Sequence, residues 1–331
     1  MITLAPDDFR SVLAEARLAP SVHNIQPSRW RWQDGTLLLL GDTARSIPVA
    51  DPSGRDWRLS HGAALEGLAI ALHGRGIAMG ELTLLEPGEP TALIPIASLR
   101  LHSLSASAPD PLPVARRVSW RGGFHPVDAE TEHDLDRLAG ARPDLSLVRG
   151  VEPIAEIAKL ADLASLHFLR QEAHRHELLQ WMRLSTSHPL YERDGLNARV
   201  MNLGAAEGWA AGLVLGRLFA PLDAVGLAAP LLSEAAKTRT AAAIALFHRP
   251  AGEDPLLSGR AFYRAWLAME HNVLKGCPMS VLADWPFSRD TLAARNAIPS
   301  DRQIVSVFRI GRPKGTPQFA HARLPIDELI V

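Results

Sequence analysis

A compact basic cluster is the first part of the sequence that could bind an anion. Arg116, Arg117 and Arg121 fall within six residues, and Ser119 lies between them. The planar guanidinium group donates paired hydrogen bonds that match the oxygens of a phosphate, and a serine hydroxyl can complete the shell. The alternative is a solvated basic turn, which is the commoner fate of such clusters. The residues alone therefore indicate a phosphate site without excluding an exposed loop.

A second stretch, residues 19–27, places small and amide side chains where they could contact a ligand. Its sequence is Ala-Pro-Ser-Val-His-Asn-Ile-Gln-Pro. Residues 9–16 show the apolar spacing of an amphipathic helix, and Pro20 ends that helix because proline lacks an amide N–H and restricts the residue before it. Asn24 and Gln26 follow, with amides that can face a ligand edge. The alternative is a polar connection with turn chemistry only.

The histidines and the single cysteine are weaker candidates. His174 and His176 are two residues apart and face different sides of a helix, so their spacing argues against a shared metal ion, and we predict no metal site. Cys277 lies between Gly276 and Pro278, and we interpret it as a small buried hydrophobic residue. The sequence also lacks G-x-S-x-G and H-E-x-x-H, which disfavours a hydrolase.

The motifs together resemble those of the FMN-dependent nitroreductase family. Residues 19–27 fit A-P-S-x-x-N-x-Q-P, and residues 117–121 fit R-x-S-x-[KR]. Residues 278–280 (Pro-Met-Ser) and 322–325 (Ala-Arg-Leu-Pro) are similar to two further motifs of that family. The resemblance covers residues about 9–75, 115–160 and 240–331, and leaves residues 183–239 outside it.

This resemblance implies a set of contacts with FMN. Arg117, Ser119 and Arg323 would hold the phosphate, Arg121 would lie by the N1/O2 edge of the flavin, and the backbone at residues 279–280 would reach N5. The cofactor-binding residues that it implies are Pro20, Ser21, Val22, His23, Asn24, Gln26, Arg117, Ser119, Arg121, Met279, Ser280, His321 and Arg323.

Two of these positions depart from the family. Ser280 stands where most members have Glu, so only its backbone role carries over. His321 stands where members usually have Lys, and it would add positive charge only when protonated. No side chain is assigned as catalytic, because the flavin would carry the chemistry.

The fold class implied is α+β, a nitroreductase-like fold of two domains, each with a mostly antiparallel sheet flanked by helices. Residues 1–104 carry the Asn/Gln loop and residues 115–331 carry the Arg-x-Ser motif, whereas ordinary members carry both in each chain of a homodimer. The chain therefore resembles the two-domain, Acg-like branch, a fused pseudo-dimer with one site. Residues 105–114 are a linker by their Pro, Ser and Ala content. Residues about 183–239 form a lid-like insertion.

Apolar periodicity predicts the elements that position these loops. Residues 60–73 form a helix whose stripe is rich in small residues, which allows close packing against another helix. A long helix runs from residue 153 toward 181, and another spans 261–275. Residues 81–85, 97–104, 241–248 and 303–310 are strands by their alternating or continuous apolar character.

Composition limits the class of protein. The chain has 331 residues, 47% hydrophobic and 21% charged, which is typical of a globular protein with a sizeable core. Its formal net charge is −1, so there is no global basic field to suggest a nucleic-acid or membrane partner. The N-terminus has no signal-peptide pattern, and one cysteine fits a reducing compartment, so we expect a cytoplasmic protein.

These observations predict an FMN-binding oxidoreductase. It would use NADPH or NADH for the two-electron reduction of a nitroaromatic, a quinone or a related small acceptor, by a ping-pong mechanism. The alternative is a protein whose insertion covers the flavin, so that FMN is bound and sequestered with little or no turnover. Because a fused pseudo-dimer buries its own interface, we expect a monomer or a weak homodimer.

Overall fold

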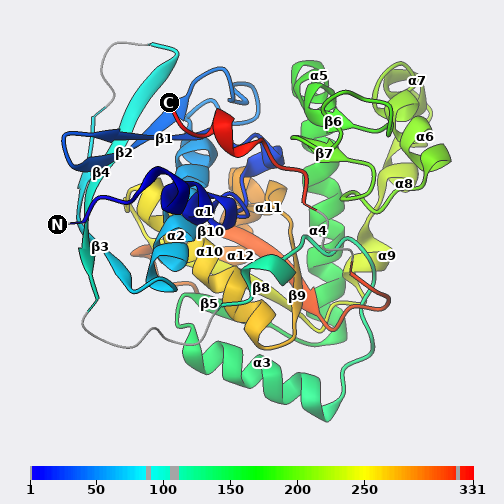
Figure 1. Ribbon diagram of the computed structural model, residues 1–331. Coiled ribbons are helices and arrows are strands. Elements are labelled where there is room, and N and C mark those ends of the chain that lie inside the picture. The colour runs from blue at the N-terminus through cyan, green and yellow to red at the C-terminus, as the bar shows by residue number, and fades with distance from the viewer. Residues whose placement is uncertain (1, 87–90, 105–111, 318–320) are drawn as a thin grey trace.

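The fold contains two antiparallel sheets, each flanked by helices (Figure 1). The computed structural model describes residues 2–86, 91–104, 112–317 and 321–331. Within these residues the first sheet has the order β1-β2-β4-β3 and the second the order β5-β8-β10-β9. The expected α+β class, with a mostly antiparallel sheet and flanking helices in each part, is confirmed.

The N-terminal sheet begins with a tight hairpin. Strands β1 (Ser28–Gln33) and β2 (Thr36–Asp42) are joined at Asp34 and Gly35, which have φ values of 49° and 72°. Two positive φ values suit an Asp-Gly turn, whose twist matches that of the strands. β4 (Leu93–Ser103) pairs with β2, and β3 (Ile77–Leu84) lies at the edge.

Helices α1 (Pro6–Ala16) and α2 (Arg55–His73) pack on this sheet and close the first core. The expected stripe of α1 is confirmed, because Phe9, Val12, Leu13 and Ala16 are all buried. α2 begins five residues before the expected start at Ser60. The Ser60 hydroxyl does not cap the helix; it accepts the Val22 amide proton and donates to the Asp56 carbonyl.

The C-terminal sheet is covered on both faces. It consists of β5 (Leu145–Val148), β8 (Ala243–Pro250), β10 (Arg302–Gly311) and β9 (Lys275–Pro278). Successive β8 side chains enter different cores: Ala245 and Phe247 pack toward α10 (Pro255–His271), whereas Ile244 and Leu246 pack toward α4 (Val151–Leu169). This two-sided burial explains the continuous apolar run of the strand. Helices α3 (Ala129–Ala141), α11 (Val281–Asp284) and α12 (Pro286–Arg295) complete this part.

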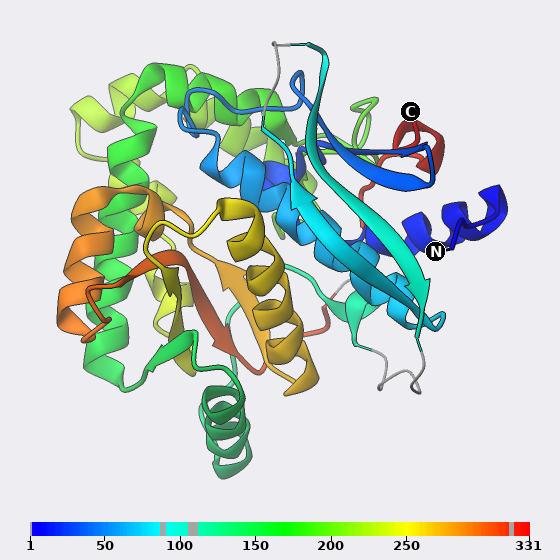
Figure 2. The same cartoon turned by 90° about the vertical axis from the view of Figure 1, so that its left-hand side faces the viewer.

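Helices α2 and α10 join the two sheets, and they lie side by side between them (Figure 2). Each helix has a glycine at the point where the two cross, and Gly62 of α2 faces Gly259 of α10. Beside this contact the Glu66 carboxylate is 1% exposed and pairs with Arg260 and Arg264. The predicted close packing of the small-residue helix is therefore confirmed.

The insertion forms a separate layer of short elements, drawn in green at the right of Figure 1. The long helix expected over residues 153–181 is divided into α4 and α5 (Glu172–Trp181). The next elements are the two-residue strands β6 (Met182–Arg183) and β7 (Leu196–Asn197), which pair in parallel. They are followed by helices α6 (Ala205–Leu215), α7 (Phe219–Ala224), α8 (Ala228–Leu232) and α9 (Ala235–Thr238).

The C-terminal segment returns to the N-terminal half of the chain. Leu324 and Leu329 are part of the first core, and Ile330 forms a bridge with Trp30 of β1. Residues 321–331, which belong to the expected C-terminal domain, therefore pack against the N-terminal half of the chain. Residues 105–111 of the expected linker lie outside the described residues, and the proposed boundaries at 104 and 115 stay a prediction.

Candidate functional site

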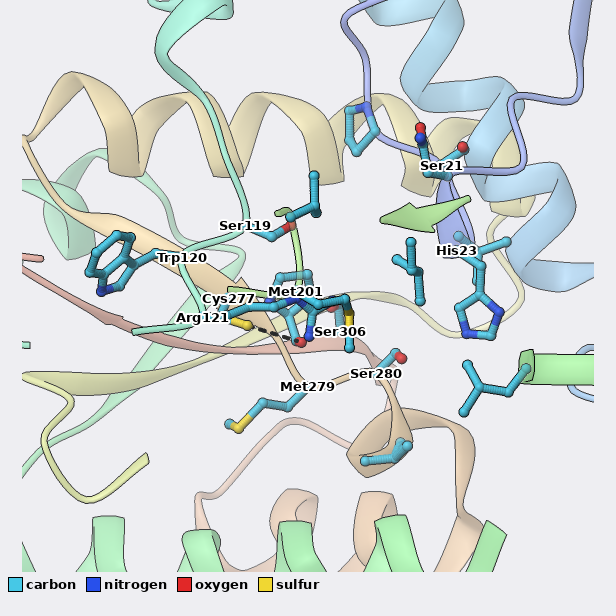
Figure 3. Close-up of a pocket in the computed structure, with 18 of the residues that line it drawn as sticks. Ser21, His23, Ser119, Trp120, Arg121, Met201, Cys277, Met279, Ser280 and Ser306 are labelled. Carbon is cyan, nitrogen blue, oxygen red and sulfur yellow. Dashed lines mark hydrogen bonds between the residues drawn. The ribbon is translucent and has the colours of Figure 1, made fainter. Parts of the chain in front are cut away.

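A cavity of about 560 Å³ lies where the N-terminal half, the C-terminal sheet and the insertion meet. This volume is in the range of small-molecule and cofactor sites. Figure 3 shows Ser21 and His23 on one side of the cavity and Ser119 and Trp120 on the other. Every residue implied by the resemblance lines the cavity except Gln26, so motifs more than 200 residues apart in sequence come together here.

The loop at residues 19–27 reaches the cavity in a strained conformation. His23 and Asn24, in the short 3₁₀ helix Val22–Asn24, have φ values of 43° and 56°, and Gln26 has 51°. Positive φ is uncommon for residues other than glycine and persists only where the surroundings enforce it. Here the Ser21 hydroxyl accepts the Gln26 amide proton at 3.0 Å. The strain places the His23 ring at the cavity wall.

The amides of this loop bind other parts of the protein. Asn24 Nδ2 donates to the carbonyls of Gly195 and Ala322, both at 3.1 Å. Gln26 Nε2 donates to the carbonyl of Arg193 at 2.9 Å, and its Oε1 accepts the Leu324 amide proton at 2.8 Å. These two side chains therefore fasten the insertion and the C-terminal segment to the loop.

Arg117 is the buried cation of the site. Its side chain lies against the Trp266 ring, with Cζ 4.5 Å from the centroid, and the residue is 4% exposed. One terminal nitrogen donates to the Leu18 carbonyl at 3.1 Å, whereas Nε has no hydrogen-bond partner. Burial lowers the pKa of Arg117, because desolvation disfavours the charged form.

Arg323 lies nearby but has its donors occupied. They reach the carbonyls of Arg17, Leu18, Ala19 and Ala322 and the Asn24 side-chain oxygen. Burial, and then the neighbouring charge of Arg117, lower the pKa of Arg323 to about 9. Arg323 can therefore add positive charge to the site, but its hydrogen bonds hold the C-terminal end of α1.

His321 adds no charge at neutral pH. Its Nε2 lies 3.2 Å from the Ala115 carbonyl, beside the short helix Val114–Arg116. Burial, followed by the charge of Arg323, lowers the pKa of His321 to about 4. It therefore differs from the lysine that usually stands at this position in the family named above.

The cavity wall contains polar atoms that need a ligand. The Nε atoms of Arg117 and Arg121 and the Nδ1 atom of His23 are buried without a partner, and all three residues line the cavity. A buried donor without a partner costs about 1–3 kcal/mol, and an unpaired buried charge costs more. Neither Arg117 nor Arg323 forms an ion pair in the part of the chain that the structure describes. The residues present therefore fit a ligand with an anionic end.

The opposite wall is formed by the end of β9 and the start of α11. Met279, Ser280 and Cys277 line the cavity there, together with Ser306 of β10. The Met279 amide donates to the Val307 carbonyl at 2.7 Å, so it is used within the sheet. Ser280 is the N-terminal boundary residue of α11, and its carbonyl accepts the amides of Ala283 and Asp284.

Part of the cavity wall was not anticipated from the sequence. Arg55 and Asp56 of α2 line it, as do side chains from α4, α5 and the insertion, among them Phe168, His174 and Met201. Of these residues, the sequence singles out only His174, as a possible metal ligand whose spacing from His176 argues against a shared metal ion. These residues are dispersed along the chain, so no local pattern marks them.

Known proteins share parts of this sequence. A Mycobacterium tuberculosis protein named as NAD(P)H nitroreductase Acg is 30% identical over 125 residues, which cover 34% of this chain and 38% of that protein. Another from the same organism, named as NAD(P)H nitroreductase Rv3131, is 42% identical over 78 residues, 23% of each chain. Parts of the chain are therefore similar to proteins named as nitroreductases. The two matches span 38% and 23% of the lengths of these relatives.

The solved structures that resemble this chain are more distant in sequence. The FMN- and NADPH-dependent nitroreductase NfnB from a Sphigopyxis strain is 17% identical, covering 66% of this chain and 96% of that one, with a TM-score of 0.36. A nitroreductase from Anabaena variabilis is 11% identical, covering 95% and 90%, with a TM-score of 0.44. No family model matches the chain. Among the described residues, no helix is both long and apolar enough to cross a bilayer.

Proposed function

We propose that this chain binds FMN in the cavity and uses NADPH or NADH to reduce a small acceptor by two electrons. The observation that carries the proposal is the buried Arg117, which lines the cavity and whose Nε has no hydrogen-bond partner. A phosphate there would supply both a hydrogen-bond acceptor and a negative charge beside the guanidinium group. The NAD(P)H nitroreductase name of the sequence relatives points the same way.

The residues of the basic motif would contact different parts of FMN. Arg117 and Ser119 would donate to the phosphate, and Arg323 would contribute charge from behind them. Arg121 has an unpartnered Nε on the cavity wall and would face the flavin, where a cation stabilises negative charge on the reduced ring. Pro20, Ser21 and Val22 would pack along the ring edge from the opposite side.

The chemistry would be supplied by the cofactor. When bound, FMN would supply the two-electron chemistry that links NAD(P)H oxidation to reduction of the acceptor, which we propose follows a ping-pong mechanism. For a quinone the balanced reaction consumes NAD(P)H, one proton and the quinone, and it releases NAD(P)⁺ and the hydroquinone. This chain's residues would bind and orient both partners and restrict water in the cavity.

A second candidate function is favoured by the way the insertion is attached. Asn24, Gln26 and Arg45 all bind residues 193–195, and Arg45 reaches the Asp194 carboxylate at 3.0 Å. An insertion held this firmly could keep nicotinamide and acceptor away from the flavin. The chain would then hold FMN without turning it over, and we retain this role as the alternative.

The proposed cofactor is tested by titrating the purified, flavin-free protein with FMN. We expect saturable binding near one equivalent, accompanied by a rise in the melting temperature, because a ligand that binds only the folded state stabilises it. Riboflavin, which lacks the phosphate, should bind much more weakly. Equal binding of FMN and riboflavin would show that the arginines do not bind the phosphate. No binding of either flavin would overturn the proposal.

We propose two further properties of this enzyme, its oligomeric state and its location. We propose that the chain is a monomer or a weak homodimer, since its two halves already pack against each other through α2 and α10. We also propose a cytoplasmic location, because a single cysteine suits a reducing compartment. Sedimentation of the purified protein and fractionation of cells that express it test these two statements.

A further inference from the structure

Three charged side chains, which we call the Arg55 cluster, lie at the cavity where the two halves of the chain meet. Arg55 and Asp56 begin α2 and line the cavity, whereas Asp284 ends α11 in the C-terminal half. Arg55 Nη2 lies 3.0 Å from Asp56 Oδ1 and 3.1 Å from Asp284 Oδ1. One arginine therefore binds two carboxyl groups, one from each half.

The cluster adjoins the loops expected to contact the flavin. Ser280 lines the cavity, as Figure 3 shows, and its carbonyl accepts the Asp284 amide proton at 3.0 Å. The two residues are thus one helical turn apart and lie on the same face. On the other side, the Ser60 hydroxyl donates to the Asp56 carbonyl and accepts the Val22 amide proton. The cluster is therefore fixed to both cavity-lining loops.

The cluster holds more negative than positive charge. Arg55 can neutralise only one of its two carboxylates, and Asp51, which caps the start of α2 by accepting the Trp57 amide proton at 2.8 Å, adds a third. Burial, and then the neighbouring Asp56, raise the pKa of Asp284 to about 8, and burial raises the pKa of Asp56 against the effect of Arg55. Two interacting carboxyl groups titrate as a pair, so the cluster holds one proton at pH 7.

Charged and titratable groups on the surrounding elements interact with other partners. They are the ion pairs Arg58–Asp254 on α2, Arg289–Asp290 on α12 and Arg309–Glu234 beside β10, and the His167 ring of α4, which stacks on Trp285. Among the described residues, Arg55 is the cation that forms an ion pair with Asp56 and Asp284. The charge imbalance of the cluster is therefore not offset by its surroundings.

Other groups of the cavity wall are less suited to donate a proton. Burial lowers the pKa values of His23, His174 and His321, so these imidazoles are neutral at pH 7. Although burial opposes the change, Arg309 lowers the pKa of Glu234, which is therefore ionised. The Arg55 cluster instead places a protonated carboxyl group at the wall.

We propose that Asp56 and Asp284 hold one proton between them and that Asp56, which lines the cavity, donates it to the acceptor as the acceptor is reduced. A ligand in this cavity is indicated independently by Arg117, which is 4% exposed and whose Nε has no partner on the same wall. Asp284 is a positioning residue that acts through Asp56. This inference rests on the proposed function and adds a side chain that takes part in the reaction.

The proton accounts for the one that the balanced quinone reaction consumes. NAD(P)H supplies a hydride equivalent, which carries both electrons. The O–H bond of the Asp56 carboxyl group breaks, its electron pair stays on the carboxylate, and the proton forms an O–H bond of the hydroquinone. A proton from solvent then restores the carboxyl group.

The stored proton is tested in the flavin-free protein by infrared spectroscopy, which separates the C=O stretch of a carboxyl group from that of a carboxylate. We expect a carboxyl signal at pH 7 that is lost as the pH rises further. Asp56→Asn and Asp284→Asn should each abolish this signal, because each leaves one carboxylate for one arginine. Asp290→Asn is the control, since Asp290 is 70% exposed on α12, and it should keep the signal. Identical spectra for the parent and both cluster variants would overturn the inference.

The donor role is tested with the FMN-loaded protein in two separate steps. Bleaching of the flavin band by NADPH needs a hydride and no proton, whereas its return with menadione consumes a proton. Asp56→Asn should slow the second step at least tenfold more than the first, because a general acid contributes about 10²–10⁴-fold. In the parent the second rate should fall as the pH rises through the pKa of the cluster, and Asp56→Asn should lose this dependence.

The two proposals fail in different ways. A protein that cannot take up FMN contradicts the proposed function and the donor role with it. A protein that NADPH reduces and menadione reoxidises, with the same rates and pH dependence in the parent and Asp56→Asn, contradicts the donor role alone. Equal slowing of both steps in Asp56→Asn would also contradict it.

Discussion

Gly62 of α2 and Gly259 of α10 meet at the crossing of the two helices that join the halves of the molecule. A Cβ atom on Gly62 would lie 2.0 Å from the Leu256 carbonyl oxygen, and one on Gly259 would lie 2.0 Å from the Leu59 carbonyl oxygen. These are backbone atoms, which cannot turn aside as a flexible side chain can. The close approach of the helices, and with it the position of the cavity between the halves, therefore depends on both glycines.

We predict that Gly259→Ala strongly destabilises the protein, by about 3 kcal/mol or more, because it forces two packed helices apart. Gly140→Ala is the matched control, since Gly140 also lies in a helix but a Cβ there meets no atom within 4 Å. It should be neutral or stabilising by up to about 1 kcal/mol. Urea unfolding measures both variants, and equal stabilities would contradict this account of the crossing.

Arg117→Ala should weaken FMN binding by about 10- to 100-fold, because charge-assisted hydrogen bonds contribute about 1.5–3 kcal/mol. Arg117→Lys keeps the charge but loses the planar fork, and we expect an intermediate affinity. Arg170→Ala is the control: Arg170 is exposed and pairs with Asp223 at 2.9 Å, away from the cavity wall. If all three variants bound FMN equally in fluorescence titrations, the phosphate assignment would be wrong.

Gln26→Ala should loosen the insertion. The substitution leaves the buried Leu324 amide without its acceptor and removes the hydrogen bond to the Arg193 carbonyl. We expect a loss of about 1–3 kcal/mol in the free energy of unfolding and faster proteolysis within residues 183–204. Gln33→Ala, at an exposed position at the end of β1, is the control and should behave like the parent protein. Resistance of Gln26→Ala to protease would show that other contacts hold the insertion.

Stability should fall on mild acidification because of His61. This side chain is fully buried in α2, its Nδ1 lies 2.8 Å from the Ser28 hydroxyl, and burial, with nearby Arg58 and Arg29, lowers its pKa to about 3. The pKa of an unfolded histidine is about 6.5, so between pH 6.5 and 3 the unfolded chain binds a proton that the folded chain does not. Stability therefore decreases as the pH falls, by about 2 kcal/mol at pH 5.

The same measurement on two variants isolates this contribution. His61→Gln should show a smaller loss of stability between pH 7 and 5 than the parent protein, whatever its stability at pH 7. His73→Gln, at the partly exposed end of the same helix, should keep the parent's pH dependence. His23, whose pKa is also lowered, adds acid sensitivity in both variants. Identical slopes for His61→Gln and the parent would refute the assignment to His61.

Local patterns in the sequence predicted which segments form helices more successfully than they predicted the residues at which those helices begin. The spacing of Phe9, Val12, Leu13 and Ala16 identified α1, because one buried helical face is a local property. The sequence predicted a helix start at Ser60, yet the Ser60 hydroxyl accepts the Val22 amide proton, and α2 begins at Arg55 after Gly54, whose φ is 69°. A tertiary hydrogen bond decided this boundary, and no local pattern reports it.

The site was predicted only where its residues belong to contiguous motifs. The loop and the basic cluster were found, and the structure brings both to one cavity. The roles of Asn24 and Gln26 depend on backbone carbonyl and amide groups about 170 and 300 residues away, which sequence spacing cannot reveal. The cavity wall formed by α4, α5 and the insertion was not predicted for the same reason, since Phe168 and Leu232 meet through the packing of the insertion and share no sequence pattern.

The most direct measurement is an anaerobic absorbance spectrum of the FMN-loaded protein before and after NADPH or NADH is added. We predict a flavin band near about 450 nm that loses its intensity within seconds and returns when an uncharged quinone is added. A band that persists under NADPH and NADH would contradict the reductase and favour an FMN-holding protein. A protein that shows no flavin band after incubation with FMN would contradict the cofactor site itself.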